Sequence, residues 1–578
     1  MKILIFDYYK KTKVIFRHCN IKNKLPALVF FICLSTILEI FGIGMLIPIT
    51  SLFIDAESSF SQKIIYSYFK NNEKDKVLQI LLIIYLTIFI IKTILVTYIE
   101  YYKSKFIHHV YRNVISTFYN EYLNTSITYF FKKNTSYIIS MMSLKVGNYS
   151  GTMIAFSSLI SELILSMFLG ILLFILTPSS AFIIVLILVT IVFLYNRVLK
   201  NLLNRLGSKR DFHEGYWMKH LSETLNFLKE INIFDAKKYF KEISDLNLSK
   251  FIDAKFKINF FSSTGRIFFE TVTILFLIVF LIISSTKSES FIAIIPLMAA
   301  YVAAAIKFLP SLNRISNGLQ YITYNYATTE SIIKELDSIT TSNQKNINEL
   351  SLEKSLSFDH SIELSNIDFS YGDEKKVLNN LNIKINKGES VAIIGESGLG
   401  KSTLVEIMCS FLNPQNGEIL IDGKNLKEFT VQWKKLIGYV PQQTFIINDT
   451  IRKNIGLCDI SNNNINEKKI LNCLKLVGLS KYLDTQRRGL DTILLEGGKS
   501  LSGGQKQRIS IARNLYKGAK IIFFDEPTSA LDEKSENDLL KELELIKKDT
   551  TLIIVTHKKK VADFCDKIID LNKINARI

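Results

Sequence analysis

Gly395-Glu-Ser-Gly-Leu-Gly-Lys-Ser402 is the stretch that decides the fold. It follows an apolar run, Ser390–Ile394, and precedes a segment with helical periodicity, Thr403–Leu412. A strand, a glycine-rich loop and a helix in this order predict a phosphate-binding loop, because backbone N–H groups at a helix N-terminus turn towards phosphate oxygens. Lys401 is expected to reach the β- and γ-phosphates, and the Ser402 hydroxyl to hold Mg²⁺. The alternative is a glycine-rich turn that matches by chance, which the later motifs disfavour.

The composition changes along the 578-residue chain, which is long enough for several domains. Residues 1–336 carry long apolar runs, residues 337–358 are polar and predict a linker, and residues 359–578 are typical of an α/β domain. The net charge of +18 would favour nucleic-acid binding in a soluble protein. Its basic residues lie beside apolar runs, so we expect membrane lipids and no nucleic acid as partners. The six cysteines have no close spacing, so they predict neither a disulfide framework nor a metal site.

Six apolar runs are candidate membrane spans, since a helix needs about 20 apolar residues to cross a bilayer. The fourth and fifth are short, and we expect their helices to extend into the flanking residues. The six runs are Pro26–Phe53, Val77–Ile99, Met153–Leu176, Ala181–Leu194, Ile267–Ile283 and Phe291–Leu309.

Two long basic segments, Tyr101–Ser150 and Tyr195–Ser263, separate these runs. The positive-inside rule places both of them, the N-terminus and the C-terminal half in the cytoplasm. Because both segments are helix-patterned, we expect each to continue its flanking spans as cytoplasmic helices, turn, and come back. Short helices that touch the soluble domain are expected at the turns, near Tyr129–Phe131 and Ile233–Asp235, because exposed aromatic clusters need a partner.

Two further segments have amphipathic character. Residues 1–24 interleave Lys and Arg with aromatic side chains, which predicts a segment at the inner membrane interface; a solvated tail is the alternative. Residues 57–71 place Phe60, Ile64 and Tyr68 at helical spacing. This pattern predicts an amphipathic helix on the outer membrane surface, with a short soluble loop helix as the alternative.

Charged residues inside apolar spans are costly and therefore mark candidate functional sites. Lys92, Arg266 and Lys307 fall towards the cytoplasmic leaflet, and one hypothesis is a cationic belt that holds an anionic headgroup. The alternative, favoured for Arg266, is that they reach lipid phosphates or pair with carboxylates. Candidate carboxylates are Glu39, Glu162 and Glu270. A polar or small stripe on the sixth span suits the wall of a water-filled cavity: Ala300, Ala304, Lys307, Ser311, Arg314 and Gly318.

A second apolar strand, Ile521–Phe524, ends in two acids. Asp525 at the end of this strand is expected to hold Mg²⁺, and Glu526 to polarise an attacking water. Two unrelated surface acids are the alternative, which a chain with a phosphate loop makes less plausible. Leu501–Gln505 begins another helix, with Ser502 as its N-cap. Because one chain already has a phosphate cradle, this second set of N–H donors most simply serves the nucleotide of a neighbouring chain.

Together these motifs resemble those of ATP-binding cassette (ABC) transporters, in the family's order and at similar spacing. The resemblance implies that Tyr371 stacks on adenine, that Gln442 meets Mg²⁺ and the nucleophilic water, and that His557 contacts the γ-phosphate. It also implies coupling roles for Ser529 and Asp532 in the D-loop and for Glu496. The chain departs from the family at Pro527 and at Lys558-Lys-Lys560, neither of which puts hydrolysis in doubt.

The resemblance implies ATP and Mg²⁺ as cofactors, with Lys401, Gln442, Glu526 and His557 as the catalytic set. Mg²⁺ would be held by Ser402, Gln442 and Asp525. ATP would be bound by Tyr371, Gly395, Glu396, Ser397, Gly398, Leu399, Gly400, Lys401, Ser402, Thr403 and Asp525, and from a second copy by Ser502, Gly503, Gly504 and Gln505.

The expected fold is a six-span α-helical membrane bundle of the ABC exporter type followed by an α/β P-loop NTPase domain. This half-transporter layout implies a homodimeric ATP hydrolase in the bacterial inner membrane. Weaker local similarity, at Arg266–Glu270 and Leu309–Ile315, resembles PglK-type flippases of lipid-linked oligosaccharides. Such a flippase is the predicted function. The alternatives are an exporter of peptides or amphipathic small molecules, and an ATP-gated channel or regulator.

Overall fold

The computed structural model describes residues 2–21, 25–44, 74–131, 133–176, 178–287, 295–347, 356–371, 376–462, 464–529 and 531–575. They form two compact units. The helical unit comprises Met1–Thr125 and Phe130–Ser342, and the sheet unit comprises Ser126–Tyr129 and Asn343–Ile578. Each unit is described by itself.

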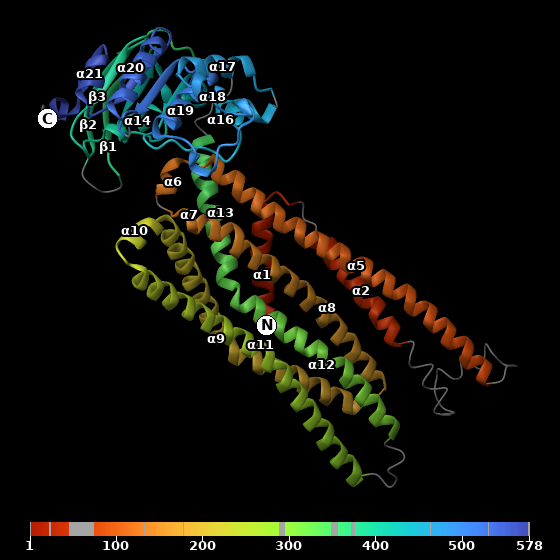
Figure 1. Cartoon of the computed structure of the whole chain (residues 1–578). Coiled ribbons are helices and arrows are strands. Elements are labelled where there is room, and N and C mark those ends of the chain that lie inside the picture. Colours follow the sequence, from red (N-terminus) through yellow and green to blue (C-terminus); the bar gives the residue numbers. More distant parts are fainter. Residues whose placement is uncertain are drawn as a thin grey trace. The chain divides into compact units, whose positions relative to one another are not determined.

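The helical unit consists of long helices joined by short ones (Figure 1). All six predicted spans fall on its helices wherever their residues are described. Its helices are α1 (Lys2–His18), α2 (Leu25–Gly44), α5 (Lys74–Asn124), α7 (Thr135–Ser140), a π-helical turn (Met141–Lys145), α8 (Val146–Leu176), α9 (Pro178–Asn226), α10 (Leu228–Ile233), α11 (Lys237–Lys287) and α12 (Ile295–Tyr324). Two further helices, α6 (Ile127–Phe131) and α13 (Tyr326–Ile347), have residues in both units.

Three of these helices are much longer than a bilayer is thick. Helices α5, α9 and α11 have 51, 49 and 51 residues, which corresponds to about 75 Å each, whereas the hydrocarbon core is about 30 Å thick. The spans therefore continue as helices beyond the apolar runs, as predicted. Within the described residues, Leu82–Asn124 and Thr135–Ile171 are long and apolar enough to cross a membrane.

Short helices form where the chain turns, at α6 and α10, which confirms the prediction of helices near Tyr129–Phe131 and Ile233–Asp235. That these helices touch the soluble domain stays a prediction. Phe131, Ile233 and Phe234 are exposed within the chain. The predicted outer helix, residues 57–71, lies outside the described residues.

Close helix packing holds the helical unit together. Helices α9 and α11 lie side by side (Figure 1). Gly207 permits α9 to approach α12, because a Cβ at this position would lie 2.0 Å from the carbonyl oxygen of Tyr324. The core between α9 and α11 consists of Leu199, Leu203, Leu206, Ala254 and Ile258.

The basic N-terminal segment forms α1, which packs on the helical unit. Tyr8 and Ile15 are fully buried, and the Tyr8 ring lies 5.2 Å from that of Phe156 on α8. The Tyr326 hydroxyl on α13 donates a hydrogen bond to Asp7 Oδ2 across 2.6 Å. The segment is therefore not a solvated tail. Its position at the inner membrane interface stays a prediction.

Helix α13 runs through Ile347, so the first part of the predicted linker, residues 337–358, is helical, and the boundary between the two units, after Ser342, falls inside this segment. Its role as a linker stays a prediction. Leu336 and Ile339 are fully buried, so the polar stretch begins as the exposed face of an amphipathic helix. A buried carboxylate fixes this helix to its neighbours. Glu335 accepts hydrogen bonds from the hydroxyls of Tyr122 and Tyr137, at 2.9 and 3.0 Å, and pairs with Lys133.

The sheet unit contains two sheets. An antiparallel sheet has the order β2 (Leu378–Asn386), β1 (Ser361–Phe369), β4 (Asn416–Ile421) and β5 (Lys424–Asn425). A parallel sheet has the order β6 (Ile437–Val440), β7 (Ile521–Asp525), β8 (Thr551–Val555), β3 (Ser390–Ile394) and β9 (Lys567–Asp570).

Alternate residues of the parallel sheet enter two cores. On β7, Ile521 and Phe523 lie in one core, whereas Ile522 and Phe524 lie in the other. Both faces are therefore buried, as is usual for a parallel sheet, and the strands read as continuous apolar runs. The helices of this unit are α14 (Lys401–Met408), α15 (Thr430–Leu436), α16 (Ile451–Ile455), α17 (Glu467–Leu476), α18 (Ser480–Asp484), α19 (Gly503–Lys517), α20 (Glu533–Ile546), α21 (Lys559–Phe564) and α22 (Leu571–Asn575).

This topology collects the predicted site residues at one edge. Strands β3, β6, β7 and β8 are parallel, so their carboxyl ends share an edge of the sheet. Ligands of open α/β sheets bind at that edge. The glycine loop follows β3, Gln442 follows β6, Glu526 follows β7 and His557 follows β8.

Candidate functional site

The loop Gly395–Ser402 joins β3 to α14 and has a backbone suited to phosphate. Gly395, Gly398 and Gly400 have φ angles of 155°, 86° and 85°, which side-chain-bearing residues rarely adopt. A Cβ on Gly400 would also lie 2.6 Å from Val377 Cγ1. The Lys401 ammonium donates to the carbonyl oxygens of Gly395 and Glu396, each across 2.8 Å. These two bonds hold the ammonium within the loop, which also contains Ser397 and Leu399.

Two oxygen ligands suited to Mg²⁺ meet beside this loop. Ser402 Oγ donates to Asp525 Oδ1 across 3.2 Å. Burial raises the pKa of Asp525, and the hydrogen bond from Ser402 opposes that shift. Hard oxygen donors fit Mg²⁺, which keeps waters and phosphate oxygens as its other ligands. Among the described residues no group of three His, Cys, Asp or Glu side chains could hold a metal. A metal here would therefore depend on the nucleotide as well.

Glu526 is the centre of a polar cluster at the ends of three strands. Gln442 Nε2 donates to Glu526 Oε2 across 2.8 Å, and His557 Nδ1 lies 3.5 Å from Glu526 Oε1. The backbone of Glu526 is held in the left-handed region, with φ of 48°, and its N–H donates to the carbonyl of Val555. Such conformations cluster at functional sites. The structure brings three members of the predicted catalytic set together. Gln442 is also a predicted Mg²⁺ ligand, and in this structure its side-chain amide donates a hydrogen bond to the Glu526 carboxylate.

Tyr371 offers an aromatic face near the loop helix. Its side chain is 41% exposed, and its ring lies edge-on to Phe369 with the centroids 5.0 Å apart. The Tyr371 hydroxyl lies 3.1 Å from Thr403 Oγ1 on α14. An exposed ring held by its hydroxyl is free to stack on a base, which agrees with the adenine contact that the resemblance implies.

The second set of backbone N–H donors lies at the start of α19, which begins with a capping box. The Ser502 N–H donates to Gln505 Oε1 across 2.9 Å, and the Gln505 N–H donates to Ser502 Oγ across 3.2 Å. Each side chain thus accepts a hydrogen bond from the backbone N–H of the other residue, which fixes the helix start. Ser502 and Gly503 are exposed, and Gly504 lies against Leu531. The start of α19 is therefore accessible to a second chain.

The predicted coupling residues lie in turns. Ser529 Oγ donates to the carbonyl of Glu526 across 3.0 Å, so the D-loop is tied to the acid of the cluster. Asp532 is the N-cap of α20, and hydrogen bonds from Ser535 lower its pKa. Glu496 is exposed in a short 3₁₀ turn whose Gly497 has a φ of 64°. Their coupling roles stay predictions.

Two basic residues outside the predicted site set, Lys558 and Arg513, hold the loops of this site. Lys558 donates to the carbonyl of Thr528 across 2.8 Å and pairs with the buried Glu536. The departure after His557 therefore has a structural role. Arg513 on α19 donates to the carbonyl oxygens of Phe445 and Asn454, at 2.7 and 2.5 Å. Burial lowers the pKa of Arg513 to about 10.

In the hypothesised cationic belt of Lys92, Arg266 and Lys307, Arg266 already has a carboxylate partner. Arg266 Nε donates to Glu270 Oε1 across 2.8 Å, so the pairing alternative holds for this residue. The Lys92 ammonium lies 5.0 Å from the centroid of the Phe89 ring. The side chain of Lys307 lies outside the described part. On the polar stripe of α12, Arg314 donates to the buried Glu162 across 2.6 Å.

Comparisons with known proteins agree with both halves of this architecture. The family description "ABC transporter transmembrane region" matches residues 40–317, and "ABC transporter" matches residues 378–529. A solved bacterial Atm1-family ABC exporter with ATP bound superimposes with a TM-score of 0.75 at 17% identity, covering 95% of this chain and 94% of that one. At this identity the likeness shows the fold alone, which is that of an ABC exporter.

Curated relatives match over a shorter stretch. The leukotoxin translocation ATP-binding protein LktB of Mannheimia glucosida is 40% identical over 214 residues, which are 37% of this chain and 30% of that protein. The toxin RTX-I translocation ATP-binding protein of Actinobacillus pleuropneumoniae matches to the same extent, with 40% identity over 214 residues. The chain therefore covers less than a third of the length of these relatives. None of these comparisons singles out the PglK-type flippases. Matched in both its membrane region and its nucleotide-binding region, the chain belongs to the ABC transporter family.

Proposed function

We propose that the chain is an ATP-driven exporter that hydrolyses ATP as a homodimer in a bacterial inner membrane. The observation that carries this proposal is the cluster of Gln442, Glu526 and His557 at the strand edge that also bears the glycine loop. A carboxylate held between an amide and an imidazole beside a phosphate cradle is suited to orienting a water for attack on a phosphoryl group.

In this proposal each residue of the site has a distinct task. The loop N–H groups and Lys401 bind the β- and γ-phosphates, and Tyr371 stacks on the base. Glu526 orients the attacking water and accepts its proton, while Gln442 holds the carboxylate in place. His557 donates to the γ-phosphoryl oxygens as charge develops on them. Mg²⁺, held by Ser402 and Asp525, would neutralise phosphate charge.

A second copy of the chain would complete the site. The start of α19 is exposed at Ser502 and Gly503, and its cap is satisfied internally. The N–H groups at such a helix start bind phosphate favourably. We propose that these groups face the γ-phosphate bound to the partner's glycine loop. A detergent-solubilised monomer should then bind ATP through Lys401 and hydrolyse it poorly.

The hydrolysis proposal is tested by replacing Glu526 in the full-length protein. In lipid nanodiscs, Glu526→Gln should lower the ATPase rate by about 10²- to 10⁴-fold while ATP binding is retained. Glu544→Gln, an exposed acid on α20, is the matched control and should behave as wild type. A Glu526→Gln protein with a near wild-type rate would remove Glu526 from the mechanism.

For the cargo, a peptide or protein is the first candidate. The curated relatives, which match 37% of this chain, are named as toxin translocation ATP-binding proteins, and these names favour a peptide or protein as cargo. A lipid-linked oligosaccharide, predicted from the weaker local resemblance, is the second. The observation that favours it is Lys92, a cation in an apolar span whose ammonium lies over the Phe89 ring.

One accumulation experiment separates the two classes. Cells that carry Glu526→Gln should retain the cargo on the cytoplasmic side, and the retained species is identified by mass spectrometry. A retained peptide favours the first class, and a retained polyprenyl-linked saccharide favours the second. Lys92→Glu should impair flipping in liposomes only if the cargo carries an anionic headgroup. Accumulation of neither class would contradict the export proposal.

A further inference from the structure

We propose that the pocket between α2 and α5 binds an anionic phospholipid of the surrounding bilayer. Its phosphate would face Lys105 and His109, and its acyl chain would lie against the aromatic wall of the pocket. This lipid site shares no residue with the ATP site, and it does not include Lys92, the residue considered for the cargo. The inference concerns the helical unit alone.

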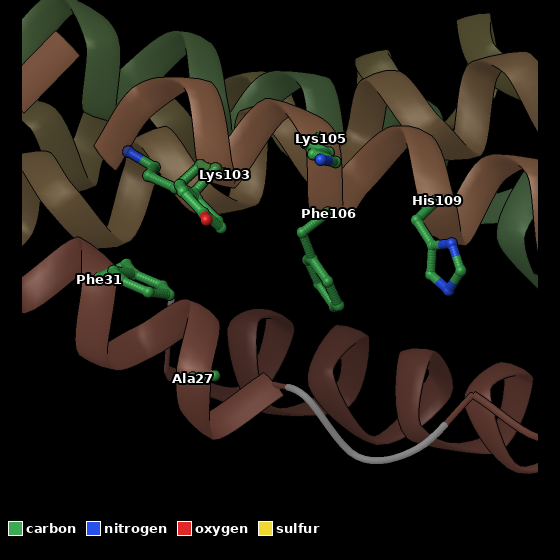
Figure 2. Close-up of a pocket in the computed structure, with 7 residues that line it drawn as sticks. Ala27, Phe31, Lys103, Lys105, Phe106 and His109 are labelled. Carbon is green, nitrogen blue, oxygen red and sulfur yellow. The ribbon is translucent and has the colours of Figure 1, made fainter. Parts of the chain in front are cut away.

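The pocket is a cavity of about 360 Å³ with apolar and basic sides. Figure 2 shows Phe31 reaching from α2, and Phe106 and His109 reaching from α5, towards the space between the two helices. These segments are far apart in the sequence and meet only in the fold. The residues that line the cavity are Ala27, Phe31, Tyr102, Lys103, Lys105, Phe106 and His109.

The apolar side is a wall of aromatic rings. The rings of Phe31 and Tyr102 are stacked, with centroids 5.8 Å apart and planes 25° apart. The ring of Phe106 lies 6.3 Å from that of Phe16 on α1, which limits its movement. A rigid aromatic surface can bury the methylene groups of an acyl chain, which favours lipid binding.

The basic side carries a net positive charge. Lys103 is 7% exposed and pairs with Glu100 across 2.5 Å, so its charge is compensated. Lys105 is exposed, and its ammonium lies 5.7 Å from the centroid of the Tyr101 ring. Among the described residues no carboxylate forms an ion pair with Lys105. His109 Nε2 lies 3.2 Å from Asn113 Nδ2.

The position of the pocket along α5 matches the depth of a lipid headgroup. The apolar run of this helix ends at Ile99, and the basic residues of the pocket follow directly. Basic and aromatic side chains at this depth lie in the interfacial region of a bilayer. A free phosphate would leave the aromatic wall uncovered, whereas a phospholipid covers both sides. Charge complementarity therefore selects an anionic phospholipid.

The test uses the full-length protein and two lipids that differ in headgroup charge. Native mass spectrometry of the purified protein, titrated with phosphatidylglycerol or with phosphatidylcholine, should show preferential retention of phosphatidylglycerol. Lys105→Gln combined with His109→Gln should weaken phosphatidylglycerol binding by about fivefold. Phosphatidylcholine retention should not change. Neither residue belongs to the ATP site, so ATPase activity reports that the variant is folded.

A matched lysine controls for general surface charge. Lys200 on α9 is exposed and lies at a corresponding distance past its own apolar run, so Lys200→Gln should leave phosphatidylglycerol retention unchanged. Ala27→Phe, which fills the cavity, should lower the retention of both lipids. The proposal is overturned by equal retention of the two lipids in the wild type, or by undiminished phosphatidylglycerol binding in the double variant. The proposal would also be overturned if the protein retained a polyprenyl pyrophosphate in place of phosphatidylglycerol. It would likewise be overturned if Phe106→Cys formed a disulfide between two copies of the chain, because a second copy would then cover the pocket.

Discussion

Gln442 donates a hydrogen bond to the Glu526 carboxylate across 2.8 Å, which joins the loop after β6 to the loop after β7. His557 follows β8, and its Nδ1 atom lies 3.5 Å from the other oxygen of the Glu526 carboxylate. The orientation of Glu526 therefore depends on two neighbouring strands. A carboxylate that keeps one orientation can act on a water at a fixed position.

Gln442→Ala should lower the ATPase rate of the full-length protein. A hydrogen bond to a charged group contributes about 1.5 to 3 kcal/mol, so its loss predicts a decrease of about 10- to 100-fold. ATP binding should change little, because Gln442 does not belong to the glycine loop. Gln486→Ala, in the segment after α18, is the control. An unchanged rate in Gln442→Ala would mean that the bond to Glu526 has no part in hydrolysis.

As the pH is lowered, the affinity for Mg²⁺ should begin to fall at a higher pH than it would if Asp525 had the pKa of an ordinary aspartate. Burial raises the pKa of Asp525, so this carboxyl takes up a proton more readily in the folded protein. The protonated carboxyl cannot bind Mg²⁺ well. In the nucleotide-free protein the same raised pKa means that the fold loses stability as the pH rises and Asp525 ionises. Titrating Mg²⁺–ATP from pH ~7.5 to ~5.5 should show a steeper loss in the wild type than in Asp525→Asn. Parallel curves for the two proteins would contradict the assignment.

Lys558→Met should destabilise the sheet unit and slow ATP hydrolysis. It leaves the buried Glu536 without its cation and frees the carbonyl of Thr528, close to Glu526 in the chain. An unpaired buried partner costs about 1 to 3 kcal/mol. Thermal unfolding of the full-length protein should report the loss, with the exposed Lys559→Met as control.

The pair itself is separated from other effects by a double variant. Lys558→Met with Glu536→Gln should be more stable than the sum of the two single changes predicts, because no buried charge is left alone. Additive losses would mean that the two residues do not interact in solution.

The sequence predicted the parts of this fold that depend on local patterns. The glycine loop was predictable because Gly395, Gly398 and Gly400 adopt φ angles that other residues avoid. The long helices α5, α9 and α11 were predictable because their helical pattern continues past the apolar runs. The pairing of Arg266 with Glu270 was also accessible, since residues four apart share a helix face.

Other features arise only from tertiary structure. The first part of the predicted linker is helical, and a single buried residue, Ile339, could not outweigh its polar composition. Lys558 and Glu536 are separated in the sequence, so no spacing indicated their contact. The lipid pocket joins Phe31 to Tyr102, which meet only because α2 packs on α5. A local sequence pattern carries no information on contacts between residues that are far apart in the chain.

The central claim, that two copies of the chain complete each ATP site, is tested most directly by mixing two inactive variants. Lys401→Ala damages the glycine loop, and Ser502→Phe blocks the start of α19, so neither homodimer should hydrolyse ATP. Co-expressed chains also form mixed dimers, in which one site has an intact loop from one chain and an intact α19 from the other. The account predicts that ATPase activity returns in purified mixed dimers, whereas mixed dimers as inactive as both parents would contradict it.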